Sequence, residues 1–209
     1  WNTLFSQITF NDIQYDGKLG LELNAIEQAN HQVKGSLHYD TYRGFGLVAN
    51  YTGRNVVGNS SRFHVSIDIA EQPKLRVQYQ KNFGKQKLLW WRSDALFEHL
   101  IQNLYVAGEL SKKMKYNYFQ FDNQINININ SLSSYVGIGI NYEIANITPA
   151  IDPKFSDDGV KLDDYSMNSL EVYAHYRFNT MNTNFYATHG TIFNASIGRS
   201  LYSQADLEF

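Results

Sequence analysis

Apolar side chains alternate with polar ones through residues 44–83, the most regular stretch of the chain. Every second residue is apolar from Phe45 to Tyr51, and the same spacing returns from Phe63 to Ile69 and from Leu75 to Tyr79. Successive side chains of a β-strand point to opposite faces of a sheet, so this period of two predicts strands with one apolar and one polar face. The polar positions of these and later strands mix both signs of charge: Arg62, His64, Asp68, Lys74, Arg76, Glu143, Glu171 and Arg177.

The same alternation predicts nine strands after residue 30. They are expected at 33–39, 44–52, 62–70, 74–83, 87–93, 116–129, 135–145, 169–179 and 191–201. The alternation is lost from Ser203 to Phe209. Before these strands, the turn signal Tyr15-Asp16-Gly17 separates two apolar-rich runs and predicts a small hairpin, followed by a polar link at 28–32.

The connections between the predicted strands differ in length at the two ends of an antiparallel sheet. Long segments at 94–115 and 146–168 fall at one end, together with the tight turns at 40–43 and 71–73. The connections near 53–61, 84–86, 130–134 and 180–190 share the other end and are fairly short. Short turns at one end and longer loops at the other are typical of an outer-membrane barrel.

Two segments in the long connections do not follow the strand pattern. Leu96, Leu100 and Leu104 have the i, i+4, i+8 spacing of a helical stripe, so residues 94–104 are either a short helix or an irregular strand end. The acidic segment 152–164 is rich in turn residues but lacks the spacing of a calcium-binding loop. An ordinary solvated loop is the favoured interpretation there.

Composition narrows the function classes. The formal net charge is −2, which gives no argument for a nucleic-acid partner, and the absence of cysteine excludes disulfides and thiolate sites. Charged residues make up 18% of the chain, below the roughly 25% of soluble domains. No run of about 18 apolar residues occurs, which excludes a spanning helix but not a barrel, since only alternate barrel residues face lipid.

A membrane barrel and a soluble β-sandwich share the two-faced strand pattern. The barrel is favoured because the polar face is charged along its length and because aromatic residues gather towards strand ends, as in the girdles of outer-membrane barrels. Nine strands is an odd number and an open edge cannot lie in lipid, so one strand is miscounted or further strands exist. The chain opens on Trp1 without a signal segment, so we expect it to be a piece of something longer. The girdle residues are Tyr39, Tyr42, Phe45, Tyr51, Tyr79, Phe83, Trp90, Trp91, Tyr176 and Phe178.

No catalytic, cofactor-binding or metal-binding residue is assigned. The chain has no G-x-S-x-G elbow, and no two histidines have the spacing of a metal pair. His64 and Ser66 share one strand face, for which packing in a lumen is favoured over a hydrolase dyad. The glycines are expected to allow close packing or bending of strands rather than to bind phosphate: Gly35, Gly137, Gly139 and Gly190.

Several phrases of the sequence resemble a known barrel. They are the Tyr39-Asp40 pair, the turn Asn55-Val56-Val57-Gly58, Pro73 ahead of an Arg/Tyr strand, the strand Tyr135 to Tyr142, and the turn from Asn179 to Gly190. They resemble the superfamily in which periplasmic POTRA domains precede an outer-membrane barrel of about sixteen strands. The closest resemblance is to the barrel of Gram-negative patatin-like phospholipases, although Ala187 stands where that family usually has Pro.

The resemblance implies an all-β fold, an antiparallel transmembrane β-barrel with about nine strands present of about sixteen, preceded by a POTRA-type hairpin. Residues 1–30 would be the tail of a POTRA-like module and 31–209 the N-terminal part of the barrel in the cell outer membrane, with the turn at Asn55 in the periplasm. The expected partners are outer-membrane lipid and an upstream domain of the same polypeptide.

The function implied is anchoring or export of an upstream patatin-like phospholipase, whose catalytic residues would lie before Trp1. The alternatives are a protein-insertion or translocation barrel acting on a client polypeptide, and a soluble all-β binding domain.

Overall fold

The computed structural model describes residues 5–15, 17–27, 29–41, 44–106, 109–129, 133–150, 164–182 and 186–206. Every element in these ranges is a β-strand. None of the described residues belongs to a helix long and apolar enough to cross a membrane. The strands are β1 (Phe5–Tyr15), β2 (Lys18–Glu27), β3 (His31–Asp40), β4 (Gly44–Arg54), β5 (Ser61–Ile69), β6 (Lys74–Phe83), β7 (Leu89–Val106), β8 (Glu109–Asn128), β9 (Ser134–Ala150), β10 (Tyr165–Asn179) and β11 (Ile192–Asp206).

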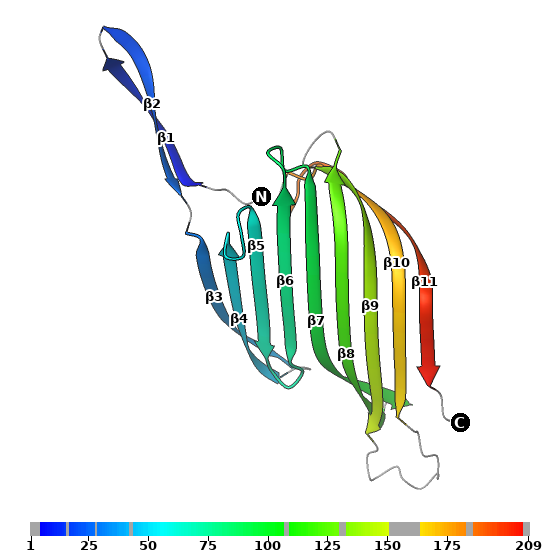
Figure 1. Ribbon diagram of the computed structural model, residues 1–209. Coiled ribbons are helices and arrows are strands. Elements are labelled where there is room, and N and C mark those ends of the chain that lie inside the picture. The colour runs from blue at the N-terminus through cyan, green and yellow to red at the C-terminus, as the bar shows by residue number, and fades with distance from the viewer. Residues whose placement is uncertain are drawn as a thin grey trace.

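The strands form two separate sheets (Figure 1). β1 and β2 pair as a hairpin, and β3 to β11 form a nine-stranded sheet in which each strand pairs with the next along the chain. All pairs are antiparallel, for example Leu37 opposite Leu47 in β3–β4 and Ile138 opposite Ile125 in β8–β9. The predicted hairpin and the nine predicted strands are therefore confirmed, and the sheet is open, with β3 and β11 at its edges.

One strand replaces the helix that was considered for residues 94–104. β7 runs without interruption from Leu89 to Val106 and pairs with β8 over that length. The helical alternative is wrong because a spacing of four is also a multiple of two, so Leu96 and Leu100 share a strand face as well as a helix face. The predicted long connection at 94–115 is also wrong, because β7 ends at Val106 and β8 begins at Glu109.

The two ends of the nine-stranded sheet carry the connections as the alternation predicts. The turn end carries 55–60, 84–88, 129–133 and 180–191, and the loop end carries 41–43, 70–73, 107–108 and 151–164. Only 151–164 is long at the loop end, so the predicted difference in length between the two ends is much weaker than expected. The candidate calcium segment lies outside the described residues except for Asp164.

The strands differ in height at the loop end. β3 to β6 are 9–11 residues long, whereas β7 to β11 are 15–20. β6 begins at Lys74 opposite Glu98, so β7 continues beyond β6 from His99 onward. β11 continues to Asp206, past the point at which the sequence loses its alternation, because β10 offers partners as far as Ser166.

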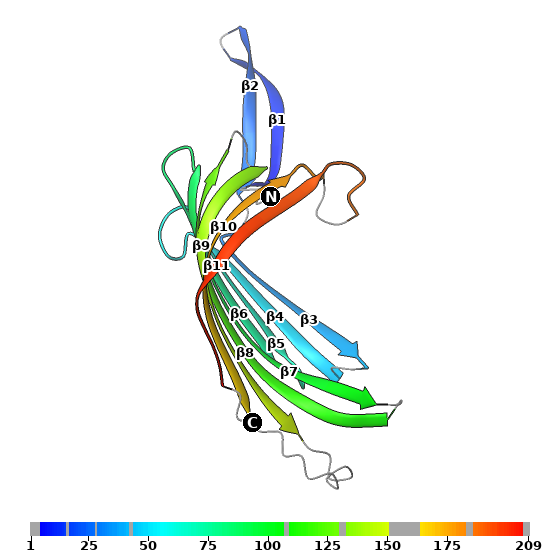
Figure 2. The same cartoon turned by 90° about the vertical axis from the view of Figure 1, so that its right-hand side faces the viewer.

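The sheet is strongly twisted and curved, and the β1–β2 hairpin stands clear of it beyond the turn end (Figures 1 and 2). Gly17 adopts φ of +70° in the hairpin turn, a conformation that glycine takes without a steric penalty. Strands with a right-handed twist and no covering second sheet curve in this way, as the wall of a barrel does.

Candidate functional site: the polar face of the sheet

The nine-stranded sheet has two chemically different faces. All eight charged or histidine positions that the alternation assigned to one face lie together on the polar face, as their cross-strand partners show. The opposite, apolar face exposes large side chains such as Ile125 (51%), Ile138 (64%) and Ile197 (77%). Nothing among the described residues covers that face, so its partner is not another part of this sheet.

Charged side chains tie β6 to β7 on the polar face. Arg76 donates from Nε to Asp94 Oδ1 (3.0 Å) and from Nη2 to Asp94 Oδ2 (2.8 Å), a bidentate pair. Gln78 Nε2 donates to the same carboxylate at 2.8 Å, which completes the partners of an Asp94 side chain that is only 7% exposed. Lys74 and Glu98 form a second pair, with 3.3 Å between Nζ and Oε1, towards the loop end.

A second set of ties joins β8 to β10 across β9. His175 Nε2 lies 2.8 Å from Asn126 Oδ1, although the two residues are two strands apart. The Tyr173 hydroxyl donates to Asp122 in the same way. Both side chains pass over β9 at its glycines, because a Cβ added at Gly137 or at Gly139 would overlap them.

Glycine alternation in β9 therefore has a structural reason. A residue with a side chain at these positions would block the approach of a β10 side chain to β8. Large aromatic side chains that cover strand glycines also pin the register of neighbouring strands. Asn126, which is fully buried (0% exposed), is held by this arrangement and donates to Gln124 Oε1 at 3.2 Å.

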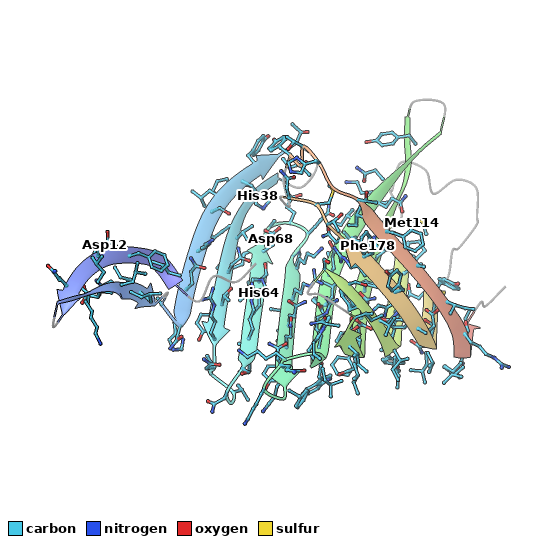
Figure 3. The ribbon with its side chains drawn as sticks, turned by 90° about the horizontal axis from the view of Figure 1, so that it is seen from above. Asp12, His38, His64, Asp68, Met114 and Phe178 are labelled. Carbon is cyan, nitrogen blue, oxygen red and sulfur yellow. The ribbon has the colours of Figure 1, made fainter. Side chains whose placement is uncertain are left out.

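The same device occurs at the start of the sheet. His38 on β3 reaches over Gly46 on β4 to Asp68 on β5, with 3.0 Å between Nε2 and Oδ1 (Figure 3). A Cβ at Gly46 would overlap the His38 ring. The polar face is thus tied across three strands at two places, near each edge of the open sheet.

The structure places Trp90 on the polar face, so its predicted position in the aromatic girdle is wrong. Trp90 and Trp91 were both predicted in a lipid-facing girdle, but consecutive strand residues point to opposite faces, so one of them must turn inward. Trp90 is 8% exposed on the polar face, where its Nε1 donates to Asn128 Oδ1 at 3.0 Å and its ring packs 5.0 Å from that of Tyr135. Trp91 stays on the apolar face, against Tyr79.

Beside the β8–β10 ties the polar face is hollowed into a concavity of about 420 Å³. Its walls carry both signs of charge, with Arg92 and Arg177 facing Asp122 and Glu171. The Arg92 Nε and His175 Nδ1 atoms are buried and have no hydrogen-bond partner among the described protein groups. A polar concavity of this kind can bind water or the polar groups of a ligand, whereas an apolar cavity cannot.

No catalytic or metal-binding arrangement stands out among the described residues. His64 Nδ1 lies 3.0 Å from Thr52 Oγ1, so the ring is engaged across β4–β5 while Ser66 lies two residues further along β5. Within the described ranges, no group of three or more His, Asp or Glu side chains is placed to hold a metal ion.

Two further glycines had been expected to serve close packing or bending. Gly190 adopts φ of +114°, which fits a bend, whereas a Cβ at Gly35 would approach no atom closer than 3.9 Å. Close packing therefore does not explain Gly35.

Sequence reasoning missed the residues that organise the polar face, namely Asp94, Asp122, Asn126 and Tyr173. The sequence does contain a signal for the residues that cross β9. Two glycines spaced by two in β9 predict that long polar side chains of a neighbouring strand cross at that point.

Comparison with known proteins bears on the fold only. No protein-family model matches the chain, and no curated protein matches it either. Among solved structures, the chain is similar to BamA from Haemophilus ducreyi, crystallised without POTRA domains 1–3, with a TM-score of 0.64 and 11% identity. The match covers 97% of this chain and 41% of that one, so the chain spans less than half the length of its structural relative.

At this identity the likeness shows the fold. The predicted all-β antiparallel barrel fold is confirmed by it. The closer resemblance to patatin-linked barrels has no counterpart in this comparison.

Proposed function

We propose that the chain forms part of a β-barrel in the outer membrane, with the apolar face of β3–β11 against lipid and the polar face lining the lumen. The observation that carries this proposal is the pairing of an uncovered apolar face with a hydrogen-bonded, charged opposite face on one sheet. In a soluble sandwich the apolar face would pack against a second sheet. The other described sheet here is the β1–β2 hairpin, which lies beyond the turn end (Figure 2).

Closure of the barrel requires strands beyond these nine. β3 and β11 are edges of the sheet, and lipid offers no hydrogen-bond partners to the backbone of an edge strand. The chain matches only 41% of the BamA chain, which leaves room for further strands in a related protein. We infer that additional strands join β11 and β3 in the complete barrel.

The β1–β2 hairpin supports a domain boundary near residue 30. One face of the hairpin carries Phe10 (60% exposed), Leu21 (64%) and Leu23 (57%), and the opposite face is mainly polar, with Asn11 opposite Glu22. An amphipathic hairpin needs a partner for its apolar face, since a single two-stranded unit is marginally stable in water. We propose that residues 1–30 are the tail of a POTRA-like module whose remainder covers this face.

The role of the barrel has two candidates. The resemblance of the sequence to patatin-linked barrels supports anchoring or export of an upstream lipid acyl hydrolase. The alternative is a barrel that acts on client polypeptides, and the fold likeness to BamA is compatible with either role. Lipid acyl hydrolysis by the full-length protein would support the first candidate, and cross-linking of an unfolded outer-membrane client to the barrel would support the second.

Detergent dependence tests the membrane placement. We expect the protein purified without detergent or lipid to aggregate through its apolar face, and to gain β-sheet circular dichroism when refolded into detergent micelles or vesicles. A monomeric, folded protein in plain buffer would contradict the barrel and favour a soluble binding domain. Sedimentation velocity with and without detergent distinguishes the two results.

A further inference from the structure

Charge is distributed unevenly between the two ends of the nine-stranded sheet. The segments next to the turn end, 53–64, 79–93, 123–142 and 176–194, contain no Asp or Glu at all. Carboxylates such as Asp68, Glu71 and Glu98 lie towards the loop end. The charged residues of the turn-end segments are all cations: Arg54, Arg62, Lys81, Lys85, Lys87, Arg92 and Arg177.

Three of these cations gather at the connection between β6 and β7. Lys85 and Lys87 are exposed in the turn that follows Gly84, where the Lys87 backbone N–H donates to Gly84 O at 3.4 Å and Lys87 has φ of +52°. Lys81 lies on the apolar side of β6, directly opposite Trp91 on β7. None of these lysines takes part in the salt bridges of the described residues, which join His38 to Asp68, Lys74 to Glu98 and Arg76 to Asp94.

Aromatic side chains surround Lys81 on the same face and lie below Lys85 and Lys87. Tyr79 and Trp91 pack edge to face with their ring centroids 5.4 Å apart, and Phe83 is 39% exposed. Tyr and Trp favour the level of the lipid headgroups, where one end of the ring is apolar and the other is hydrated. Lysines just outside such a belt place their ammonium groups among the headgroups.

We propose that the β6–β7 turn, through Lys81, Lys85 and Lys87, binds the headgroups of anionic phospholipids in the leaflet that faces the turn end. This inference rests on the proposed membrane placement of the sheet. Opposite charge selects anionic over zwitterionic lipid, and the Tyr79–Trp91 pair sets the depth at which the turn meets the bilayer.

The position of the lysines favours lipid over an acidic polypeptide in the lumen. Lys81 is on the lipid-facing side, whereas Arg54 and Arg62 face each other on the polar side of β4 and β5. A ligand inside the barrel would meet the arginines and not the lysines. Selectivity among lipids is therefore a property of the outer surface near β6 and β7.

The test measures lipid preference at the protein surface. The full-length protein is placed in bilayers, and the association of spin-labelled phosphatidylglycerol is compared with that of spin-labelled phosphatidylcholine by electron spin resonance. We expect a preference of about threefold for phosphatidylglycerol at low salt, because each lysine near the surface attracts anionic lipid. In K85Q/K87Q the preference should fall close to one, as it should for the wild type in about 0.5 M salt.

The matched control is K113Q/K115Q. It removes the same two charges from exposed lysines on the same face of the sheet, but from β8 near the loop end. The control should keep the full preference. No preference in the wild type, or an equal loss in both double variants, overturns the proposal. Failure of the wild type to enter bilayers, seen as the absence of a heat-dependent gel shift, removes the proposed function and this inference together, whereas insertion without preference removes the inference alone.

Discussion

Ile140→Arg is expected to destabilise the protein folded in a bilayer by about 2–4 kcal/mol. Ile140 is 51% exposed on the apolar face of β9, opposite Val172 of β10. If that face meets hydrocarbon, the substitution places a guanidinium in lipid, where no partner compensates for the lost hydration. Urea-dependent refolding into vesicles, followed by tryptophan fluorescence, measures the change.

The neighbouring position supplies the control. Asn141 follows Ile140 in β9, points to the polar face, and lies opposite both Asp122 and Glu171. Asn141→Arg gives up hydrogen bonds to Gln120 and Glu143 but brings a cation among carboxylates, so it should cost about 1 kcal/mol or less. Equal costs for the two variants would contradict the assignment of faces.

Gly137→Ala should destabilise the sheet by about 2–3 kcal/mol. The new Cβ would overlap Asn126 and His175, whose hydrogen bond ties β8 to β10. Asn126 is fully buried and has little room to shift, so the tie breaks and a buried amide loses its partner. Thermal unfolding in detergent, monitored by circular dichroism, reports the loss.

Gly35→Ala is the matched comparison, because the nearest atom to its added Cβ is 3.9 Å away. It should leave stability unchanged or slightly higher, since alanine reduces the freedom of the unfolded chain. A similar loss of thermal stability in both variants would contradict this explanation. It would mean that glycine is needed for strand flexibility in general, and not for the crossing of side chains over β9.

Period-two alternation was enough to place all nine strands of the large sheet and to divide their residues between two faces. It succeeded because burial of one face imposes the period directly on the sequence. It failed at Leu96 and Leu100, since residues four apart share a face in both a helix and a strand. Both leucines lie on the polar side of β7, where the alternation gives no apolar signal.

The ties of the polar face could not be predicted in the same way. Asp94 and Asp122 lie directly opposite each other in β7 and β8, an arrangement that local pattern would disfavour. Asp94 is satisfied by Arg76 of the neighbouring strand β6, and Asp122 by Tyr173 of β10, which lies two strands away. Such contacts depend on the register of three or four strands at once, which the sequence of any one strand does not contain.

The difference in strand length at the loop end has a consequence for the mouth of the proposed barrel. β5 and β6 end close to the level at which Lys74 meets Glu98, whereas β3 and β4 run on to Asp40 and Gly44, and β7 and β8 continue furthest, to Val106 and Glu109. The rim at the loop end is therefore uneven, lowest at β5 and β6 and highest at β7 and β8. In the proposed barrel, the wall at the loop end would be lowest beside β5 and β6, so a molecule that crosses the opening would meet the least obstruction on that side.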